Sequence, residues 1–527
     1  MSSPATTSAP RTSRIGSQKF WSRRKLFFLI SAAVLICLAT IFYVKYWPFS
    51  REAVLQDLKE ASDSTVTAQS YHPTYFPPGC VLYGLEFHHG SNQFKLIEIQ
   101  KLRVRGSYLG IFRRHVPQII AEGAHIFIPA GETSFHTQHS QTVVDELVAN
   151  GSFVEFERKE AHERPFRFDV HEATLRDVRW DKAIKYHLKF HNPNPPSEIS
   201  ADGKFGPWST GNAEATPLSG AYTFEHADLG VYHGIGGILS SRGSFDGPLH
   251  HITVSGSTYT PDFHVKSSNN KFKLTTNFDA YVDGRNGDTF LKSVEAHFGN
   301  TSLLAEGSIA AVQGHKGKVT RLQISSRRAR IEDVLGLFTE NRAPMSGQTA
   351  LTTSVEIPSG HQPFLHRLKL EGKFGIDQGS FTKPETQNNV NELSAGARGQ
   401  NNKEDPPPVM TDLKGSVNLA DATAHFLDIS FGIPGAQARL HGTYGIVEPY
   451  RINLHGEMRV ETRISKTTSG MKSFLLKVID PIFKKKKKGE VVPVHVLGTY
   501  DKPDFGLDLG NKQDPNKQDS NKQDTKR

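Results

Sequence analysis

The chain has 527 residues, 63 of them basic and 54 acidic, and hydrophobic residues make up 37%, so it can bury a sizeable core. Much of the net charge of +9 lies in the first 25 residues and in a run of five lysines near the C-terminus, which argues against a broad basic surface. The cluster Arg327, Arg328 and Arg330 has no aromatic residues interleaved with it, so it does not favour nucleic-acid binding. No disulfide is expected, because Cys37 lies in an apolar run and Cys80 beyond it.

The N-terminal region contains the apolar run LFFLISAAVLICLATIFYV at residues 26–44, which has no charged side chain. As a helix this run would measure about 28 Å, enough to cross the hydrocarbon core of a bilayer. Basic residues without acidic ones precede it, and aromatic residues flank it. We therefore expect a cytoplasmic tail at 1–25 and a transmembrane helix at 26–46. A cleaved signal peptide is the alternative, but the run is longer than usual and no A-x-A site follows it.

After a short helical stem at 51–61 the hydrophobic pattern changes from period 3.6 to period 2. Residues 271–282 have one apolar face, formed by Phe272, Leu274, Thr276, Phe278, Ala280 and Val282. Such alternation indicates antiparallel sheet with one face buried. We expect a β-rich region over 51–384, with a hairpin loop at 283–288 and short helices at 143–149 and 331–338.

The C-terminal part begins with residues 385–408, which are rich in Asn, Gln and Gly and end in three prolines, so a flexible linker or loop is expected. A second β region follows at 409–510. An amphipathic helix is predicted within it at 471–483. The last residues, 511–527, contain no apolar side chain and are expected to be disordered.

The helix predicted at 471–483 has two interpretations. Its apolar stripe includes Phe474, Leu475 and Val478. The lysine run follows it directly, as Lys484, Lys485, Lys486, Lys487 and Lys488. The helix either packs on the end of the sheet with a solvated lysine loop, or lies at a membrane interface with these lysines against anionic headgroups. Under the second interpretation all eight residues are membrane-contact candidates.

No catalytic motif is recognisable in the sequence. Residues 314–320 lack the Walker spacing, and the pairs His162-Glu163 and His171-Glu172 are not followed by the second histidine of a zincin motif. The adjacent histidines His88 and His89 would point to opposite faces of a strand, which separates their rings. We therefore expect no enzymatic activity, no catalytic residues, no cofactor and no metal site.

Several short motifs resemble the bacterial AsmA-like proteins. They are Tyr75-Phe-Pro-Pro-Gly79, Val104-x-Gly-Ser-Tyr108, the segment 122–129, Gly243-Ser-Phe-Asp-Gly-Pro-Leu249, the segment 254–263, and 474–483 leading to 498–505. Together with the N-terminal anchor, the resemblance runs over most of residues 20–510. It implies a protein anchored in the bacterial inner membrane, with a periplasmic domain built as an elongated, curled antiparallel β-groove. Related bridge-like proteins are implicated in carrying phospholipid between the inner and outer membranes, and the family offers no catalytic residues.

The expected function is envelope biogenesis, with phospholipid acyl chains held or conducted in a hydrophobic groove between the two membranes. The groove candidates are Phe272, Leu274, Phe278 and Val282. The expected partners are the inner membrane, phospholipid and, at the far end, the outer membrane or an envelope protein, with no nucleic acid. The alternative is a structural factor for the assembly of outer-membrane proteins that transports no lipid. The alternation fits both, because it does not say whether Phe278 contacts a lipid or another side chain.

Overall fold

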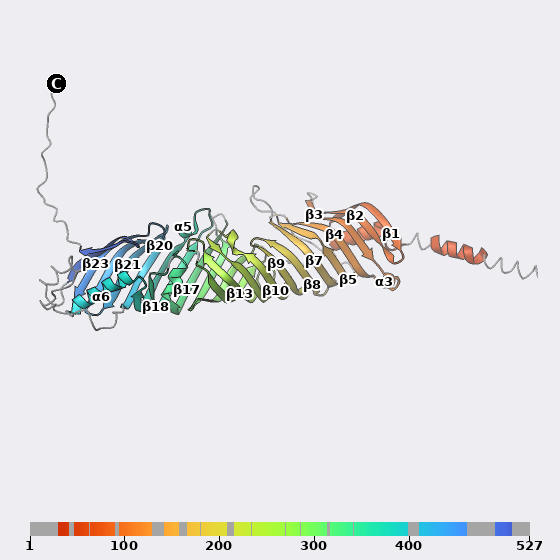
Figure 1. The fold of residues 1–527 in the computed structure, drawn as a ribbon. Coiled ribbons are helices and arrows are strands. Elements are labelled where there is room, and N and C mark those ends of the chain that lie inside the picture. Colours follow the sequence, from red (N-terminus) through yellow and green to blue (C-terminus); the bar gives the residue numbers. More distant parts are fainter. Residues whose placement is uncertain are drawn as a thin grey trace, which may run out of the picture.

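The computed structural model describes residues 30–41, 47–62, 64–89, 94–128, 142–156, 166–179, 181–207, 215–232, 234–268, 270–284, 286–312, 317–340, 342–398, 410–460 and 491–507. Residues 30–41 are helical, and Figure 1 shows this helix beyond the β1 end of the fold, apart from the sheet. Across these ranges no helix is both long enough and apolar enough to span a membrane. The rest of the transmembrane segment expected at 26–46, residues 26–29 and 42–46, lies outside the described residues.

The described part of the chain is mainly β and forms one long, almost wholly antiparallel sheet with few short helices. The strands of its first half are β1 (Thr65–Tyr75), β2 (Pro78–His89), β3 (Phe94–Arg105), β4 (His115–Ile128), β5 (Val143–Asn150), β6 (Ser152–Phe156), β7 (Phe166–Val178), β8 (Ile184–Pro193), β9 (Pro196–Phe205), β10 (Pro217–Asp228), β11 (Ile235–Gly236), β12 (Ile238–Pro248) and β13 (Ile252–Val265). Those of its second half are β14 (Phe272–Asp283), β15 (Asp288–Phe298), β16 (Thr301–Ala311), β17 (Lys318–Arg330), β18 (Met345–Ile357), β19 (Lys369–Phe381), β20 (Thr411–Ala420), β21 (Thr423–Ile433), β22 (Ala436–Gly445), β23 (Arg451–Val460), β24 (Val491–Thr499) and β25 (Pro503–Leu507).

The helices lie at the ends of strands or over the sheet. They are α2 (Arg51–Ser62), α3 (Tyr108–Arg113), α4 (Ile331–Gly336), α5 (Phe364–Arg367) and α6 (Pro384–Arg398), with a 3-10 turn, η2, at Leu229–Val231. α2 confirms the expected stem helix, and α4 confirms the helix expected at 331–338. The predicted hairpin loop at 283–288 is also confirmed, since Asp283 pairs with Asp288 at the end of β14 and β15.

The order of strands in the sheet follows the chain almost throughout. Most strands pair with the preceding and the following strand, as β13, β14 and β15 do. Two places depart from this order. β5 and β6 both pair in parallel with β4 and antiparallel with β7. The two-residue β11 is passed over, because β10 pairs with β12 and β11 pairs with β13. Figure 1 shows the result, a sheet elongated along one axis from β1 to β23.

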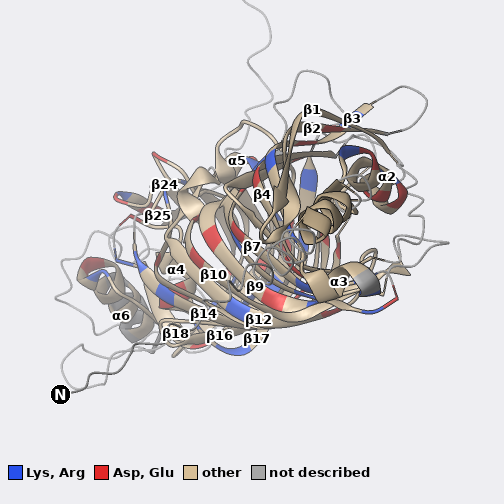
Figure 2. Cartoon of the chain, turned by 90° about the vertical axis from the view of Figure 1, so that its right-hand side faces the viewer, with Lys and Arg blue, Asp and Glu red and all other residues tan. Residues whose placement is uncertain are grey.

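The sheet curls around its long axis, as Figure 2 shows in the view along that axis from the β1 end. It therefore has two rims. The α4 rim is the side of the sheet where β13, β15 and β17 end. The α5 rim is the opposite side, where β14, β16 and β18 end. Phe338, which follows α4, packs in the same hydrophobic cluster as Leu365 of α5 and Val355 of β18. Side chains from opposite rims can meet on the apolar face only if the sheet curls toward that face, so we call the apolar face the inner face.

The helix expected at 143–149 is wrong. These residues form β5, where Val144 is buried and Leu147 pairs with Leu175 of β7. An apolar run of this length cannot be assigned to helix or strand from its periodicity alone, and pairing with β4 and β7 decides the outcome here.

The linker expected at 385–408 is corrected over its first part, where residues form α6. Val390 packs against the cluster that contains Ile376 and Met410, and the Ser394 hydroxyl donates a hydrogen bond of 2.9 Å to the carbonyl oxygen of Pro434. These tertiary contacts outweigh the low helix propensity of Asn and Gly. β19 pairs directly with β20, so the sheet continues without a break from the region 51–384 into 409–510. The predicted helix at 471–483 and the tail at 511–527 lie outside the described residues.

Candidate functional site

The four groove candidates lie on the inner face of β14, as the alternation predicted. Phe272, Leu274, Phe278 and Val282 are all partly buried, whereas Lys273, Asn277 and Asp279 on the other face are exposed. Phe272 stands apart from the others because it lies at the α4 rim, edge-on to Phe298 with 5.7 Å between ring centroids. A Cβ added at Gly336 of α4 would lie 3.1 Å from its Cζ. Phe272 is therefore packed against the rim, and Leu274 and Phe278 lie farther in.

The same apolar face continues through the neighbouring strands from β8 to β16. Inward positions there are partly buried, and outward positions are mostly exposed. Inward residues that the sequence analysis did not single out are Leu188, Ile199, Tyr222, Phe245, Val254 and Val294. Among the described residues, none of these and none of the four candidates belongs to a cluster of buried hydrophobic residues. The signal that could have found them is the alternation in stretches such as residues 218–224.

No charged residue occupies an inward position of β8–β16 within the described strands. The register shows this directly, because Phe278 opposes Gly256 and Val294, while outward Asp279 opposes Ser255 and Ser293. The remaining pairings of these strands continue the same two faces. The inner face of this stretch is thus an uncharged surface of aliphatic, aromatic and hydroxyl side chains.

Aromatic rings on this face lie across glycines of the adjacent strand. A Cβ added at Gly256 would lie 3.2 Å from Cζ of Phe278, and one added at Gly220 would lie 2.9 Å from Cζ of Phe245. The rings therefore lie close against the sheet. Glycine also removes bulk from the concave side, which allows the strands to bend, and an aromatic ring covers the backbone that glycine leaves exposed.

The hydroxyl groups of the inner face bond to one another. Thr258 and Thr276 are joined by a hydrogen bond of 2.7 Å between their Oγ1 atoms, and Tyr222 Oη lies 3.1 Å from Ser241 Oγ. Burial raises the pKa of Tyr222, and the hydrogen bond with Ser241 offsets part of that rise. These groups stay neutral at physiological pH, so they add hydrogen bonds to the face without adding charge.

The outer face carries the charges, arranged as pairs between neighbouring strands. His187 Nδ1 lies 2.7 Å from Asp202 Oδ1, and Lys189 Nζ lies 2.9 Å from Glu172 Oε2. The hydrogen bond from Lys189 and its charge lower the pKa of the Glu172 carboxyl. These solvated pairs contribute little to stability individually, and they keep the outer face polar.

Both ends of the inner face are covered by helices, and within the stretch from β8 to β16 the segment between η2 and β11 reaches α5, because a Cβ added at Gly234 would clash with Phe364. At the β1 end, Val54, Leu55 and Leu58 of α2 pack with Leu82 of β2 and Leu102 of β3. Toward the C-terminus, α4, α5 and α6 contribute to clusters at both rims. The stretch from β8 to β16 lies between these covered parts.

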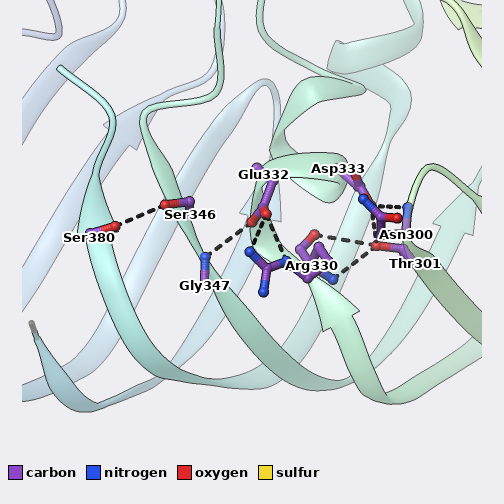
Figure 3. Close-up of polar contacts among 8 residues, drawn as sticks. All are labelled: Asn300, Thr301, Arg330, Glu332, Asp333, Ser346, Gly347 and Ser380. Carbon is purple, nitrogen blue, oxygen red and sulfur yellow. Dashed lines mark hydrogen bonds and ion pairs between the residues drawn. The ribbon is translucent and has the colours of Figure 1, made fainter.

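A polar network holds α4 at its rim (Figure 3). Glu332 pairs with Arg330 at 2.6 Å and accepts a hydrogen bond of 3.1 Å from the Gly347 backbone N–H. Asp333 accepts hydrogen bonds from the backbone N–H of Asn300 at 2.7 Å and from Thr301 Oγ1 at 2.9 Å. Burial acts to raise the pKa of Glu332, but the backbone hydrogen bonds and Arg330 hold it below its usual value. The network joins β16, β17 and β18, which gives it a structural role.

The described residues contain no group of three or more His, Cys, Asp or Glu side chains that could hold a metal ion. The membrane-contact candidates Phe474, Leu475, Val478 and Lys484–Lys488 lie outside the described residues. Comparisons with protein-family models, with curated proteins and with solved structures found no match to this chain.

Proposed function

We propose that this chain holds phospholipid acyl chains in a hydrophobic β-groove formed by the inner face of β8–β16. The observation that supports the proposal is the partly buried, uncharged inner face between two covered ends. Apolar surface left facing water is unfavourable, and large contiguous patches of it mark binding sites. Each CH₂ group of an acyl chain buried there gains about 0.8 kcal/mol, so a lipid tail can be held without specific polar chemistry.

The length of the proposed groove fits acyl chains that lie along it. The two-residue β11 does not widen this stretch, because β10 pairs directly with β12. The other eight strands from β8 to β16, at about 4.8 Å each, give about 38 Å. This length would hold a small number of lipids end to end. The covered ends favour a lipid-holding site of limited length over a passage that runs the whole length of the sheet.

The proposal includes anchoring in a membrane through residues 26–46, with the N-terminus in the cytoplasm and the β-domain in the periplasm of a bacterium. Its support is the apolar helical segment 30–41, in which every residue is exposed. Ile30, Leu35, Ile36 and Ile41 are more than half exposed. Twelve such residues in water would be costly, and a bilayer removes that cost. The resemblance to AsmA-like proteins supports the same arrangement and the same lipid ligand.

A photo-crosslinking experiment tests the lipid site directly. p-Benzoylphenylalanine is placed at Phe278, on the inner face, or at Asn277, the exposed neighbour on the outer face of the same strand. We expect crosslinks to phospholipid from position 278 and none from position 277, detected by mass spectrometry of protein purified from membranes. Crosslinks only to other parts of the chain would contradict the proposal.

A charge substitution separates the lipid site from a packed scaffold. Phe278→Asp places a carboxylate on the inner face, and Asn277→Asp places the same charge on the outer face as a control. For an open groove, we expect both variants to fold and only Phe278→Asp to lose co-purified lipid. In a closed core the buried carboxylate would cost several kcal/mol and unfold the domain. Unfolding of Phe278→Asp alone would therefore favour the structural assembly factor over the lipid carrier.

A further inference from the structure

An exposed apolar cluster lies at the β1 end of the molecule, formed by the β1–β2 turn and α3. Phe76 is 86% exposed, Leu109 is 78% exposed and Tyr108 is 44% exposed. The cluster has a fixed geometry, because the Phe76 and Tyr108 rings are 6.1 Å apart and Tyr108 Oη donates a hydrogen bond of 2.7 Å to the Tyr75 carbonyl oxygen. Two separate loops are thus joined so that they present these apolar side chains to solvent.

The cluster is close to the exposed apolar helix along the chain. The Trp47 ring lies 5.1 Å from the ring of Tyr75, which precedes Phe76. Only residues 42–46 separate Trp47 from the helix at 30–41. Six peptide steps of about 3.5 Å reach at most about 21 Å, so the end of that helix cannot lie far from the cluster. Figure 1 shows α3 and β1 at the end of the sheet nearest to the helix.

Positive charge accompanies the apolar side chains. Arg113 at the end of α3 is exposed, and residues 75–78 and 107–114 contain no acidic side chain. The neighbouring Arg114 interacts electrostatically with Asp57 of α2. Exposed aromatic and aliphatic residues beside basic ones are the composition of segments that rest in the interfacial layer of an anionic membrane.

We propose that Phe76, Tyr108 and Leu109 rest in the interfacial layer of the membrane that holds the N-terminal helix, with Arg113 against anionic phospholipid headgroups. This inference rests on the anchoring part of the proposed function. The contact fixes the β1 end of the sheet on the bilayer and directs the long axis of the sheet away from it.

The test uses the full-length chain in nanodiscs, with Cys37→Ser to remove the exposed native thiol. A fluorescent label is attached at Leu109→Cys or, as a control, at Leu304→Cys, since Leu304 is 53% exposed on the outer face of β16. Interfacial residues are buried about 5–10 Å deep, so replacing the lipids by brominated phospholipids should lower the fluorescence at position 109 by about half. The fluorescence at position 304 should not change.

The outcomes separate this inference from the proposed function. If the chain does not enter nanodiscs, both the anchor and the docking are wrong. If it enters and label 109 is quenched no more than label 304, only the docking is wrong. As a test of charge, Arg113→Gln should reduce the quenching of label 109 in nanodiscs that contain anionic phosphatidylglycerol and leave it unchanged in neutral phosphatidylcholine. Equal quenching of label 109 with and without Phe76→Ser and Tyr108→Ser would also overturn the proposal.

Discussion

The β1 end of the sheet and the stretch from β8 to β16 have the same alternation of apolar and polar residues but differ in what covers the apolar face. Leu82 and Leu85 at the β1 end are fully buried, whereas Leu274 and Phe278 in the middle stay partly exposed. The difference arises from α2, whose apolar side chains pack onto the strands of the first region. Alternation therefore identifies the apolar face of a strand, and a separate element decides whether that face becomes a core.

Specific contacts hold the covering helix in place at the β1 end. Trp47 packs against Phe49 and Tyr75, with ring centroids 5.7 Å and 5.1 Å away. The Tyr71 hydroxyl donates a hydrogen bond to the Phe49 carbonyl oxygen, and the Arg51 guanidinium donates one of 2.8 Å to the Ala68 carbonyl oxygen on β1. These contacts lie at the start of α2, so the helix is fixed where the chain arrives from the N-terminal segment.

The largest contrast is expected from matched leucine truncations. Leu82→Ala leaves a cavity in a closed core and should reduce the free energy of unfolding by about 2–5 kcal/mol. Leu274→Ala removes the same atoms from a partly exposed face and should cost about 1 kcal/mol, because less apolar area returns to water. Chemical denaturation of both variants in the same detergent measures the difference. Equal losses would show that the inner face of β14 is as tightly packed as the β1 end.

A smaller effect is expected from Gly220→Ala, which tests the glycines beneath the aromatic rings. The new Cβ would lie 2.5 Å from the Asp202 carbonyl oxygen and 2.9 Å from Cζ of Phe245, so strand or ring must move. We expect a loss of about 1–3 kcal/mol in unfolding free energy. Gly375→Ala on β19 is the control, since its Cβ would meet no atom within 4 Å. If Gly220→Ala were as stable as the control, the close packing of rings on glycines would not be needed for the curl.

An effect of pH, small near neutrality, reports only on the β1 end. Burial raises the pKa of the Cys80 thiol to about 12, so the folded state keeps it protonated. An unfolded thiol ionises near its ordinary pKa of about 8.5. The contribution of the neutral Cys80 thiol to the free energy of unfolding is therefore complete below that pH. This contribution decreases as pH rises toward 12, by at most about 1.4 kcal/mol per pH unit. At pH 8, iodoacetamide should modify Cys80 at the rate at which this core opens. Leu82→Ala should accelerate that reaction and Leu274→Ala should not; equal acceleration by both would mean that the two regions open together.

Sequence reasoning succeeded where local pattern determines structure. The period-2 alternation predicted the shared face of Phe272 and Phe278, and the Gly- and Asp-rich loop predicted the β14–β15 hairpin. Sequence reasoning failed where contacts between distant parts of the chain determine the local structure. β5 lies beside β4, and α6 packs through Val390 on Ile376 and Met410. The contact of Phe272 with Gly336 of α4 could not be predicted either, because 64 residues separate them and nothing local indicates the return of the chain.

The sequential pairing of the strands has consequences for how the sheet unfolds and for how inserted or deleted strands would change its length. Where each strand touches only its neighbours in the chain, free energy is distributed as in repeat proteins, through nearest-neighbour interfaces. Such a chain can assemble progressively from the N-terminus during synthesis and can fray from either end while its centre stays intact. A hairpin inserted or removed between β8 and β16 would lengthen or shorten the proposed groove by about 10 Å without altering either covered end. Under the proposed function, the number of hairpins would therefore set how much lipid the groove holds.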